Sequence, residues 1–260
     1  MELYHIFDLV GIVASMVHNI LSRPFSKLVR PLKDHGSKKS PHDSRPLGPQ
    51  PTDHWEGRPP LIVFILGPPG AGKETHSKRL RRDFPGLTHL SYGDMLRYQA
   101  SIPASWVSTF PRRGGGIEGD PVLPAADAVR LLRETIESGV ARGQRIWLID
   151  GFPRTREHMA AWADTQIPRA KQAFFLECNG LVLVDRILGR AGTSGRPDDA
   201  DVESVRERIN RNMAASEAML QACRDYGVPV ITIAADRDLD AVYRDIQNHF
   251  EGVISGEGSS

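Results

Sequence analysis

The sequence predicts an α/β domain with a parallel sheet covered by helices on both faces. From Leu61 onward, short apolar runs alternate with stretches of helical periodicity, which is typical of strands buried on both sides. A glycine-rich stretch, GPPGAGKET at 67–75, separates the first apolar run from the first helical stretch. These observations favour one main domain built from strand–helix units.

The predicted elements follow one another in a regular order. The five predicted strands are LIVFIL, LTHLSY, RIWLID, QAFFLEC and VPVITIA. A helix is compatible with residues 74–84, and another with residues 125–142, where Val129, Leu132 and Ile136 fall on one face. We find no internal repeat of 20 to 50 residues, so a solenoid or array is excluded.

Composition excludes several classes of function. The chain has 260 residues and a formal net charge of +1, which gives no bulk electrostatic reason to expect nucleic acid or an anionic membrane as a partner. Its two cysteines, Cys178 and Cys223, are too few and too far apart for a disulfide framework or a metal cluster. Both lie in apolar patterns, so we expect two buried thiols in a reducing compartment.

Residues 1–60 form an N-terminal extension of different character, with eight of the nineteen prolines. We expect a short helix near its start and a disordered linker over 34–60. The apolar run between Asp8 and His18 is well short of the ~20 residues that a membrane span needs. We therefore expect no stable span, and favour a helix that docks on the domain or on a partner.

The main domain is expected at 61–252, followed by a disordered tail at 253–260. A cytoplasmic location is the first interpretation. A mitochondrial presequence in the extension is the alternative, although Glu2 and Asp8 stand where such peptides avoid acids.

The glycine-rich stretch has the glycines and the lysine of a phosphate-binding loop, in the strand-to-helix context that this motif requires. Backbone N–H groups and the helix N-terminus would hold phosphates, and Lys73 would reach their terminal oxygens. Glu74 stands where the strict pattern has a hydroxyl residue, but Thr75 offers a hydroxyl one residue later. The loop is therefore expected to hold a nucleotide.

Three further stretches make this interpretation specific: LSYGDMLR from Leu90, LIDGFPRT from Leu148, and GRAGTSGRPDDADVESVRER from Gly189. Together with the loop, they resemble the nucleoside monophosphate kinases, closest to the UMP-CMP kinases and then to adenylate kinase. The resemblance implies a P-loop kinase fold with a five-stranded parallel sheet, a short donor lid at about 190–200 and an acceptor-binding segment at about 91–124. It also implies transfer of the γ-phosphoryl of MgATP to a nucleoside monophosphate, with CMP or UMP the first guess for the acceptor and AMP the second.

The resemblance assigns roles residue by residue. Catalytic roles fall on Lys73, Arg154, Arg190, Arg196 and Arg208. ATP-binding roles fall on Gly67, Pro69, Gly70, Ala71, Gly72, Lys73, Glu74, Thr75 and Arg190. Acceptor-binding roles fall on Ser91, Tyr92, Arg97, Val122, Gly151, Arg154 and His158. Asp150 and Asp94 are expected to hold Mg²⁺ through waters, with Thr75 as a further metal contact. Arginines suit this work because a planar guanidinium grips phosphate oxygens bidentately.

The chain also departs from the family pattern. Glu74 replaces a glycine, and His76 stands where glutamine is usual. Tyr92 and His158 occupy base-reading positions where the family carries other residues, so acceptor specificity is not carried over. Between Arg97 and Val122, prolines and a triple glycine exclude a continuous helix.

These departures leave alternatives open. One is a catalytically impaired nucleotide-binding protein that acts through partners, motivated by Glu74 and the altered acceptor segment. Another is a kinase for an unusual acceptor. We expect a monomer whose small-molecule partners are ATP and a nucleoside monophosphate.

Overall fold

The computed structural model describes residues 55, 59–112, 120–189 and 201–256. The expected donor lid at 190–200 and nearly all of the N-terminal extension lie outside these ranges. All five predicted strands and the helices between them lie within them.

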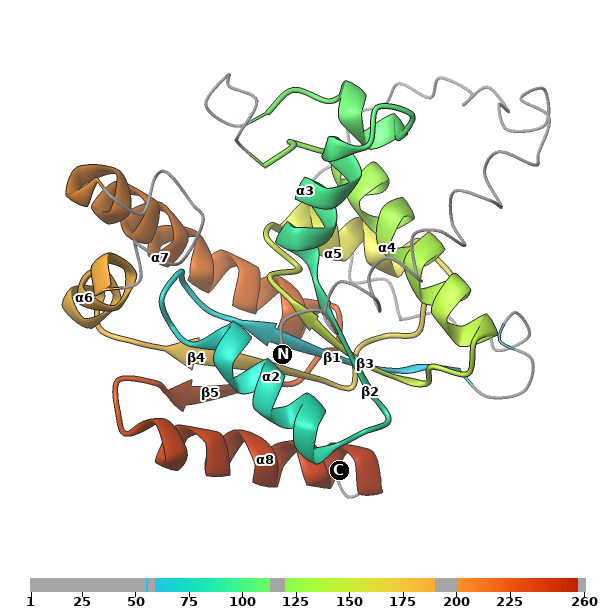
Figure 1. Cartoon of the computed structure of the whole chain (residues 1–260). Coiled ribbons are helices and arrows are strands. Elements are labelled where there is room, and N and C mark those ends of the chain that lie inside the picture. The colour runs from blue at the N-terminus through green and yellow to red at the C-terminus, as the bar shows by residue number, and fades with distance from the viewer. Residues whose placement is uncertain (1–54, 56–58, 113–119, 190–200, 257–260) are drawn as a thin grey trace.

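A five-stranded sheet forms the centre of the domain (Figure 1), and its strands pair in the order β2-β3-β1-β4-β5. All four pairings are parallel, as predicted. The strands are β1 (Leu61–Leu66), β2 (Leu87–Ser91), β3 (Ile146–Asp150), β4 (Gln172–Glu177) and β5 (Val230–Ala234). The continuous apolar runs of the three central strands, β3, β1 and β4, are explained by burial on both faces, whereas the edge strands β2 and β5 are partly exposed.

Helices cover both faces of this sheet, which confirms the predicted fold class. They are α2 (Lys73–Asp83), α3 (Tyr92–Ser101), α4 (Ala125–Ala141), α5 (Arg156–Ala163), α6 (Gly180–Gly189), α7 (Val202–Asp225) and α8 (Leu239–Ser255), with a short 3₁₀ helix, η3 (Trp106–Thr109). Helices α3, α4 and α5 lie on one side of the sheet, and α2 and α8 lie on the other (Figure 1).

Two hydrophobic cores follow from the alternation of side chains along each strand. On β1, Ile62 and Phe64 belong to the core under α4 and α5, whereas Val63 and Ile65 belong to the core under α2 and α8. All four side chains are fully buried. Because β1 is the central strand, the loop that follows it is anchored by both cores.

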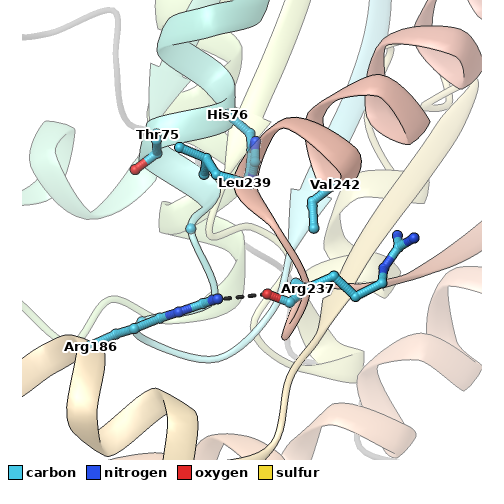
Figure 2. Close-up of a pocket in the computed structure, with 9 residues that line it drawn as sticks. Thr75, His76, Arg186, Arg237, Leu239 and Val242 are labelled. Carbon is cyan, nitrogen blue, oxygen red and sulfur yellow. Dashed lines mark hydrogen bonds between the residues drawn. The ribbon is translucent and has the colours of Figure 1, made fainter.

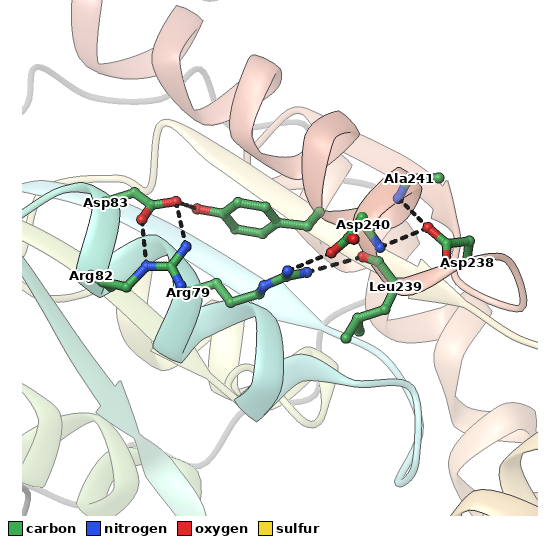
Figure 3. A network of polar contacts seen from close by, with 8 residues as sticks. Arg79, Arg82, Asp83, Asp238, Leu239, Asp240 and Ala241 are labelled. Atoms are coloured by element: carbon green, nitrogen blue, oxygen red, sulfur yellow. Dashed lines mark hydrogen bonds and ion pairs between the residues drawn. The ribbon is translucent and has the colours of Figure 1, made fainter. Parts of the chain in front are cut away.

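Helices α2 and α8 are joined by a polar network at their solvent edge (Figure 3). Arg79 on α2 pairs with Asp240 on α8, and the hydroxyl of Tyr243 on α8 donates to Asp83 on α2. Asp238 caps the N-terminus of α8 by accepting from the N–H groups of residues 240 and 241. Helix α2, which starts at the glycine-rich loop, is thereby held against α8.

The boundaries of the domain differ from expectation at both ends. Helix α8 continues through Ser255 and ends at Gly256, which has a positive φ of 83°. Val253 is only 8% exposed, so the expected disordered tail at 253–260 begins too early. Trp55, expected in the linker, is 3% exposed, and its Nε1 donates to the carbonyl oxygen of Gln166 at 2.9 Å.

The predictions about the cysteines and about membrane spans can be checked in the described residues. Both cysteines are free and buried, as expected. Burial raises the pKa of the Cys223 thiol to about 12, which makes it inert at neutral pH. Within those same residues, no helix is long and apolar enough to cross a membrane.

Candidate active site

The glycine-rich loop connects the end of β1 to the start of α2 at Lys73. Gly67 has a φ of +142°, and a Cβ there would lie 2.7 Å from the carbonyl oxygen of Leu176, so a side chain is excluded. Gly72 immediately precedes α2 with a φ of +93°. The Nζ of Lys73 donates to the carbonyl oxygens of Gly67 at 2.9 Å and Pro68 at 3.2 Å. The lysine ammonium therefore lies across the loop, where a phosphate chain would be held.

The unexpected carboxylate of Glu74 is directed along its own helix. It pairs with the Nζ of Lys78, one turn later, at 2.7 Å, and both side chains are more than half exposed. The ammonium of Lys78 therefore partly offsets the repulsion between the Glu74 carboxylate and a bound polyphosphate. Glu74 does not disturb the loop, since Lys73 and the glycines keep their expected positions.

A cavity of about 330 Å³ opens beside the loop (Figure 2). It is lined by Gly70, Gly72, Thr75, His76, Arg186, Ala235, Arg237, Leu239 and Val242. The loop, α6 and the β5–α8 connection all contribute to it. The Nη1 of Arg186 donates to the carbonyl oxygen of Ala235 at 2.9 Å and so fixes α6 to the end of β5. The cavity combines apolar walls with two guanidinium groups, which suits a nucleotide.

His76 lies between this cavity and α8. It is 2% exposed, and its ring is parallel to that of Tyr243 with centroids 6.3 Å apart. Burial, together with the neighbouring guanidinium groups of Arg79 and Arg186, lowers the pKa of His76 to about 4. The imidazole is therefore neutral at physiological pH and adds no charge to the cavity.

Two arginines converge at the carboxyl end of β2 and β3. Arg97 comes from α3, and Arg154 comes from the segment between β3 and α5. A Cβ built on Gly93 would lie 3.3 Å from Nη2 of Arg154 and 3.4 Å from Nη1 of Arg97. The glycine lets both guanidinium groups lie close to the backbone here. They form a paired cationic site of the kind that binds a phosphate monoester.

Arg154 is held by a carbonyl oxygen and by an aromatic ring. Its Nε donates to the carbonyl oxygen of Gly151 at 3.2 Å. Its guanidinium carbon lies 4.8 Å above the ring centre of Tyr92. Tyr92 is 2% exposed, and burial raises its pKa to about 12. It therefore stays neutral, and its ring lies beneath the guanidinium group of Arg154. Tyr92 thus supports this guanidinium group.

A carboxylate that was not predicted, Asp120, lies between the two arginines. Its Oδ1 is 2.7 Å from Nη1 of Arg97, and its Oδ2 is 3.5 Å from Nη1 of Arg154. Arg97 also pairs with Asp94 on its own helix. Burial alone would lower the pKa of Arg97, but the carboxylates of Asp94 and Asp120 outweigh burial and raise that pKa.

His158 lies in the first turn of α5, next to Arg154. Its Nδ1 accepts from the backbone N–H of Arg154 at 3.0 Å, while Thr155 caps the helix by accepting from the N–H of His158 at 3.3 Å. Burial, and then the charge of Arg154, lower the pKa of His158 to about 4. Because Nδ1 is an acceptor, the neutral ring carries its proton on Nε2.

The two predicted metal carboxylates lie at adjacent strand ends. Asp150 ends β3 and is 8% exposed, and its Oδ2 lies 3.9 Å from Nε2 of His89. Asp94 is in the first turn of α3, where its N–H donates to the Oγ of Ser91 at 3.3 Å. In the sheet register, Ser91 is opposite Asp150, and Ile65 of β1 is opposite it on the other side. The predicted carboxylates and the loop therefore share the carboxyl edge of the sheet.

Three predicted arginines and one valine remain. Arg190 and Arg196 lie outside the described residues, so their expected roles in the lid stay predictions. Arg208 is half-buried on α7. Val122 is 49% exposed and donates its backbone N–H to the carbonyl oxygen of Pro111 at 2.8 Å.

The acceptor segment is interrupted, as expected. Helix α3 ends at Ser101, η3 follows, and Arg112 forms an isolated antiparallel bridge with Pro121. The Nη2 of Arg112 donates to the carbonyl oxygen of Ala100 and so closes the end of α3. This arginine supports the segment instead of facing a ligand.

Sequence reasoning missed three charged residues of the site: Asp120, Arg186 and Arg237. Arg186 carried a signal, because it and Asp185 interrupt an otherwise apolar helical pattern at 180–189. Asp120 carried none, since it follows a glycine-rich stretch that has no periodicity. Arg237 gains its place only through the connection between β5 and α8.

A strand, a glycine-rich loop and a helix that together hold a lysine, beside a pair of convergent arginines, define a phosphate-loop phosphotransferase. Comparison with known proteins makes the class more specific. The family model for adenylate kinase matches residues 65–227. The UMP-CMP kinase of Rattus norvegicus is 32% identical over 196 residues, which are 74% of this chain and 97% of that protein.

Two further relatives agree. The uridylate kinase of Saccharomyces cerevisiae is 31% identical over 187 residues, covering 72% of this chain and 89% of that protein. The human UMP-CMP kinase is 31% identical over 196 residues, with 74% and 97% covered. The chain belongs to the adenylate kinase family and is a nucleoside monophosphate kinase.

Proposed function

We propose that this kinase transfers the γ-phosphoryl of MgATP to CMP or UMP in preference to AMP, giving ADP and a nucleoside diphosphate. The observation that carries the proposal is the pair of anion sites at one edge of the sheet. Lys73 and the loop form one, and Arg97 and Arg154 form the other. Two anion sites are what a transfer between two nucleotides requires, since catalysis is mostly positioning and charge stabilisation.

The cavity beside the loop supports a site for the donor nucleotide. The cavity beside the loop extends from Thr75 to Arg186 and Arg237 (Figure 2). We assign the phosphates of ATP to the loop and its base and ribose to this cavity. Leu239 and Val242 supply apolar contact, and the arginine side chains can stack on a base.

The residues at the strand ends fit Mg²⁺. Asp150, Asp94 and the hydroxyl of Thr75 offer oxygen donors only, and Mg²⁺ prefers oxygen ligands and keeps several of its waters. Asp150 and Asp94 would hold it through those waters, and Thr75 would be a direct contact. The ion would neutralise charge on the phosphates of ATP.

The preference for a pyrimidine acceptor is supported by the two kinds of relatives, which are named for UMP, CMP and uridylate. Within the described residues, no observation favours the alternative of a catalytically impaired protein. That alternative was motivated by Glu74 and by the altered acceptor segment; Glu74 pairs with Lys78 and leaves the loop intact, and the interrupted segment still brings Asp120 to Arg97.

The test is a coupled assay of ADP release with MgATP and each of CMP, UMP, AMP, GMP and dCMP. The parent is expected to turn over a pyrimidine monophosphate fastest. Arg154→Ala should lower kcat/KM for the acceptor about 30-fold or more, which corresponds to the ~2 kcal/mol expected of a charge-assisted grip. Arg156→Ala is the matched control, because Arg156 is exposed and pairs with Asp225 away from the site.

Each part of the proposal can fail separately. If Arg154→Ala keeps turnover within twofold of the parent, the assigned acceptor site is wrong. If AMP is the fastest acceptor, the kinase assignment stands and the pyrimidine preference is wrong.

A further inference from the structure

The carboxylate of Asp120 occupies the position between the two acceptor-site arginines. Each of its oxygens is directed at a different guanidinium, Oδ1 at Nη1 of Arg97 and Oδ2 at Nη1 of Arg154, at 2.7 and 3.5 Å. Its side chain is only 26% exposed. This is the bridging arrangement that two oxygens of a phosphate monoester would make with the same nitrogens.

Asp120 already engages the Nη1 atoms of both guanidinium groups. Both converge over Gly93, where even a single added methyl would be within 3.4 Å of each. Arg154 is fixed further by the carbonyl of Gly151 and the ring of Tyr92. A phosphate that engages both Nη1 atoms must therefore take the volume that the carboxylate holds.

Charge explains why a carboxylate at this place is favourable without an acceptor. Two converging guanidinium groups repel each other, and one carboxylate between them offsets that repulsion. A phosphate monoester carries more negative charge and more acceptor oxygens than a carboxylate, so it can displace Asp120.

We propose that Asp120 is an internal competitor for the phosphate of the acceptor nucleotide, and that its carboxylate must leave the position between Arg97 and Arg154 before a nucleoside monophosphate binds. The inference rests on the proposed assignment of these arginines to the acceptor. Its consequence is quantitative: the apparent affinity for the acceptor equals the intrinsic affinity multiplied by the fraction of molecules in which Asp120 has left. Binding of the donor is not affected, because Asp120 does not line the cavity beside the loop.

The test compares Asp120→Asn with the parent protein. The neutral amide should lower the KM for CMP or UMP at least fivefold and leave the KM for MgATP within twofold. Asp120→Glu keeps the charge and should stay closer to the parent than to Asp120→Asn. The matched control is Asp164→Asn, which removes one charge at the exposed end of α5.

Calorimetry with CMP and with inorganic phosphate, in the absence of ATP, separates this inference from the proposed function. Tighter binding of both probes by Asp120→Asn supports the role of Asp120 as a competitor, whether or not an acceptor is phosphorylated. If no acceptor is phosphorylated by the parent, the proposed function alone is refuted. Normal turnover by the parent, with KM and binding unchanged or weakened in Asp120→Asn, refutes the competitor alone. Asp120→Ser is measured in parallel, so the result does not depend on the folding of one variant.

Discussion

Glu74 lies in the first turn of α2, where a carboxylate is favoured by the positive end of the helix dipole. Its pairing with Lys78 one turn later is of the i,i+4 kind that stabilises an exposed helix by a few tenths of a kcal/mol. The residue is therefore accounted for by the stability of α2. Because Lys78 pairs with this carboxylate, the electrostatic repulsion between Glu74 and a phosphate on the loop is reduced.

We expect Glu74→Gly to change kcat/KM for MgATP less than threefold. The same substitution should lower the free energy of unfolding by about 1 kcal/mol, since glycine is a poor helix former. Glu74→Gln is the control, because it removes the charge and keeps helix propensity. ADP release and urea denaturation measure the two effects. A rise in kcat/KM above tenfold in Glu74→Gly would show that the carboxylate inhibits the enzyme.

Single residues differed in how far the sequence could predict them. Lys73, Arg97 and Arg154 were predictable because each belongs to a short motif at a fixed distance from a strand end. The support that Tyr92 gives to Arg154 depends on the packing of α3 against the segment between β3 and α5, where Tyr92 contacts Phe152, and local spacing does not report that packing. Asp120 pairs with Arg97 and Arg154, which are 23 and 34 positions away in the sequence, so its role needs the tertiary structure.

At the scale of elements, strands were predictable because burial on both faces leaves an unmistakable apolar run, as in β1 and β4. The ends of helices were harder to predict from the sequence. The end of α8 was misjudged because Gly252 looks like a helix stop, yet it lies inside the helix. What continues the helix is the burial of Val253 against the core under α2 and α8, a tertiary effect that overrides local propensity.

The extended α8 predicts a difference between two truncations. Ending the chain after Gly252 removes Val253 and the helical turn around it, and should lower the free energy of unfolding by about 1 to 2 kcal/mol. Ending it after Gly256 keeps the buried valine and the positive-φ glycine, and should leave stability unchanged. Thermal and urea denaturation of both truncations measure this. Equal stability of the two truncated proteins would mean that residues 253–256 do not hold the helix.

At the scale of the whole molecule, the two faces of the sheet each bury a neutral histidine next to cations. His76 packs against α8 beside Arg79 and Arg186, and His158 packs against Phe152 beside Arg154. In both places, burial is the first cause of the lowered pKa. Burial first, and then the neighbouring guanidinium groups, therefore keep both imidazoles unprotonated at neutral pH.

The pH dependence of stability follows from these two groups. In the unfolded chain a histidine has a pKa near 6.5, and in the folded protein both values are about 4. Their contribution is thus fully present above about pH 6.5 and is lost as the pH falls toward 4, because the unfolded chain then takes up protons that the folded protein does not. Each histidine should cost on the order of 1 to 3 kcal/mol of unfolding free energy over that window.

Urea denaturation at pH 7 and pH 5 measures this loss, since the difference spans most of the window and precedes the titration of most carboxylates. The double substitution His76→Gln and His158→Asn should flatten the pH dependence, whatever it does to stability at pH 7. His249→Gln, at an exposed position on α8, should leave the pH dependence as it is in the parent. A double variant that loses as much stability between pH 7 and pH 5 as the parent would assign the acid sensitivity to other groups.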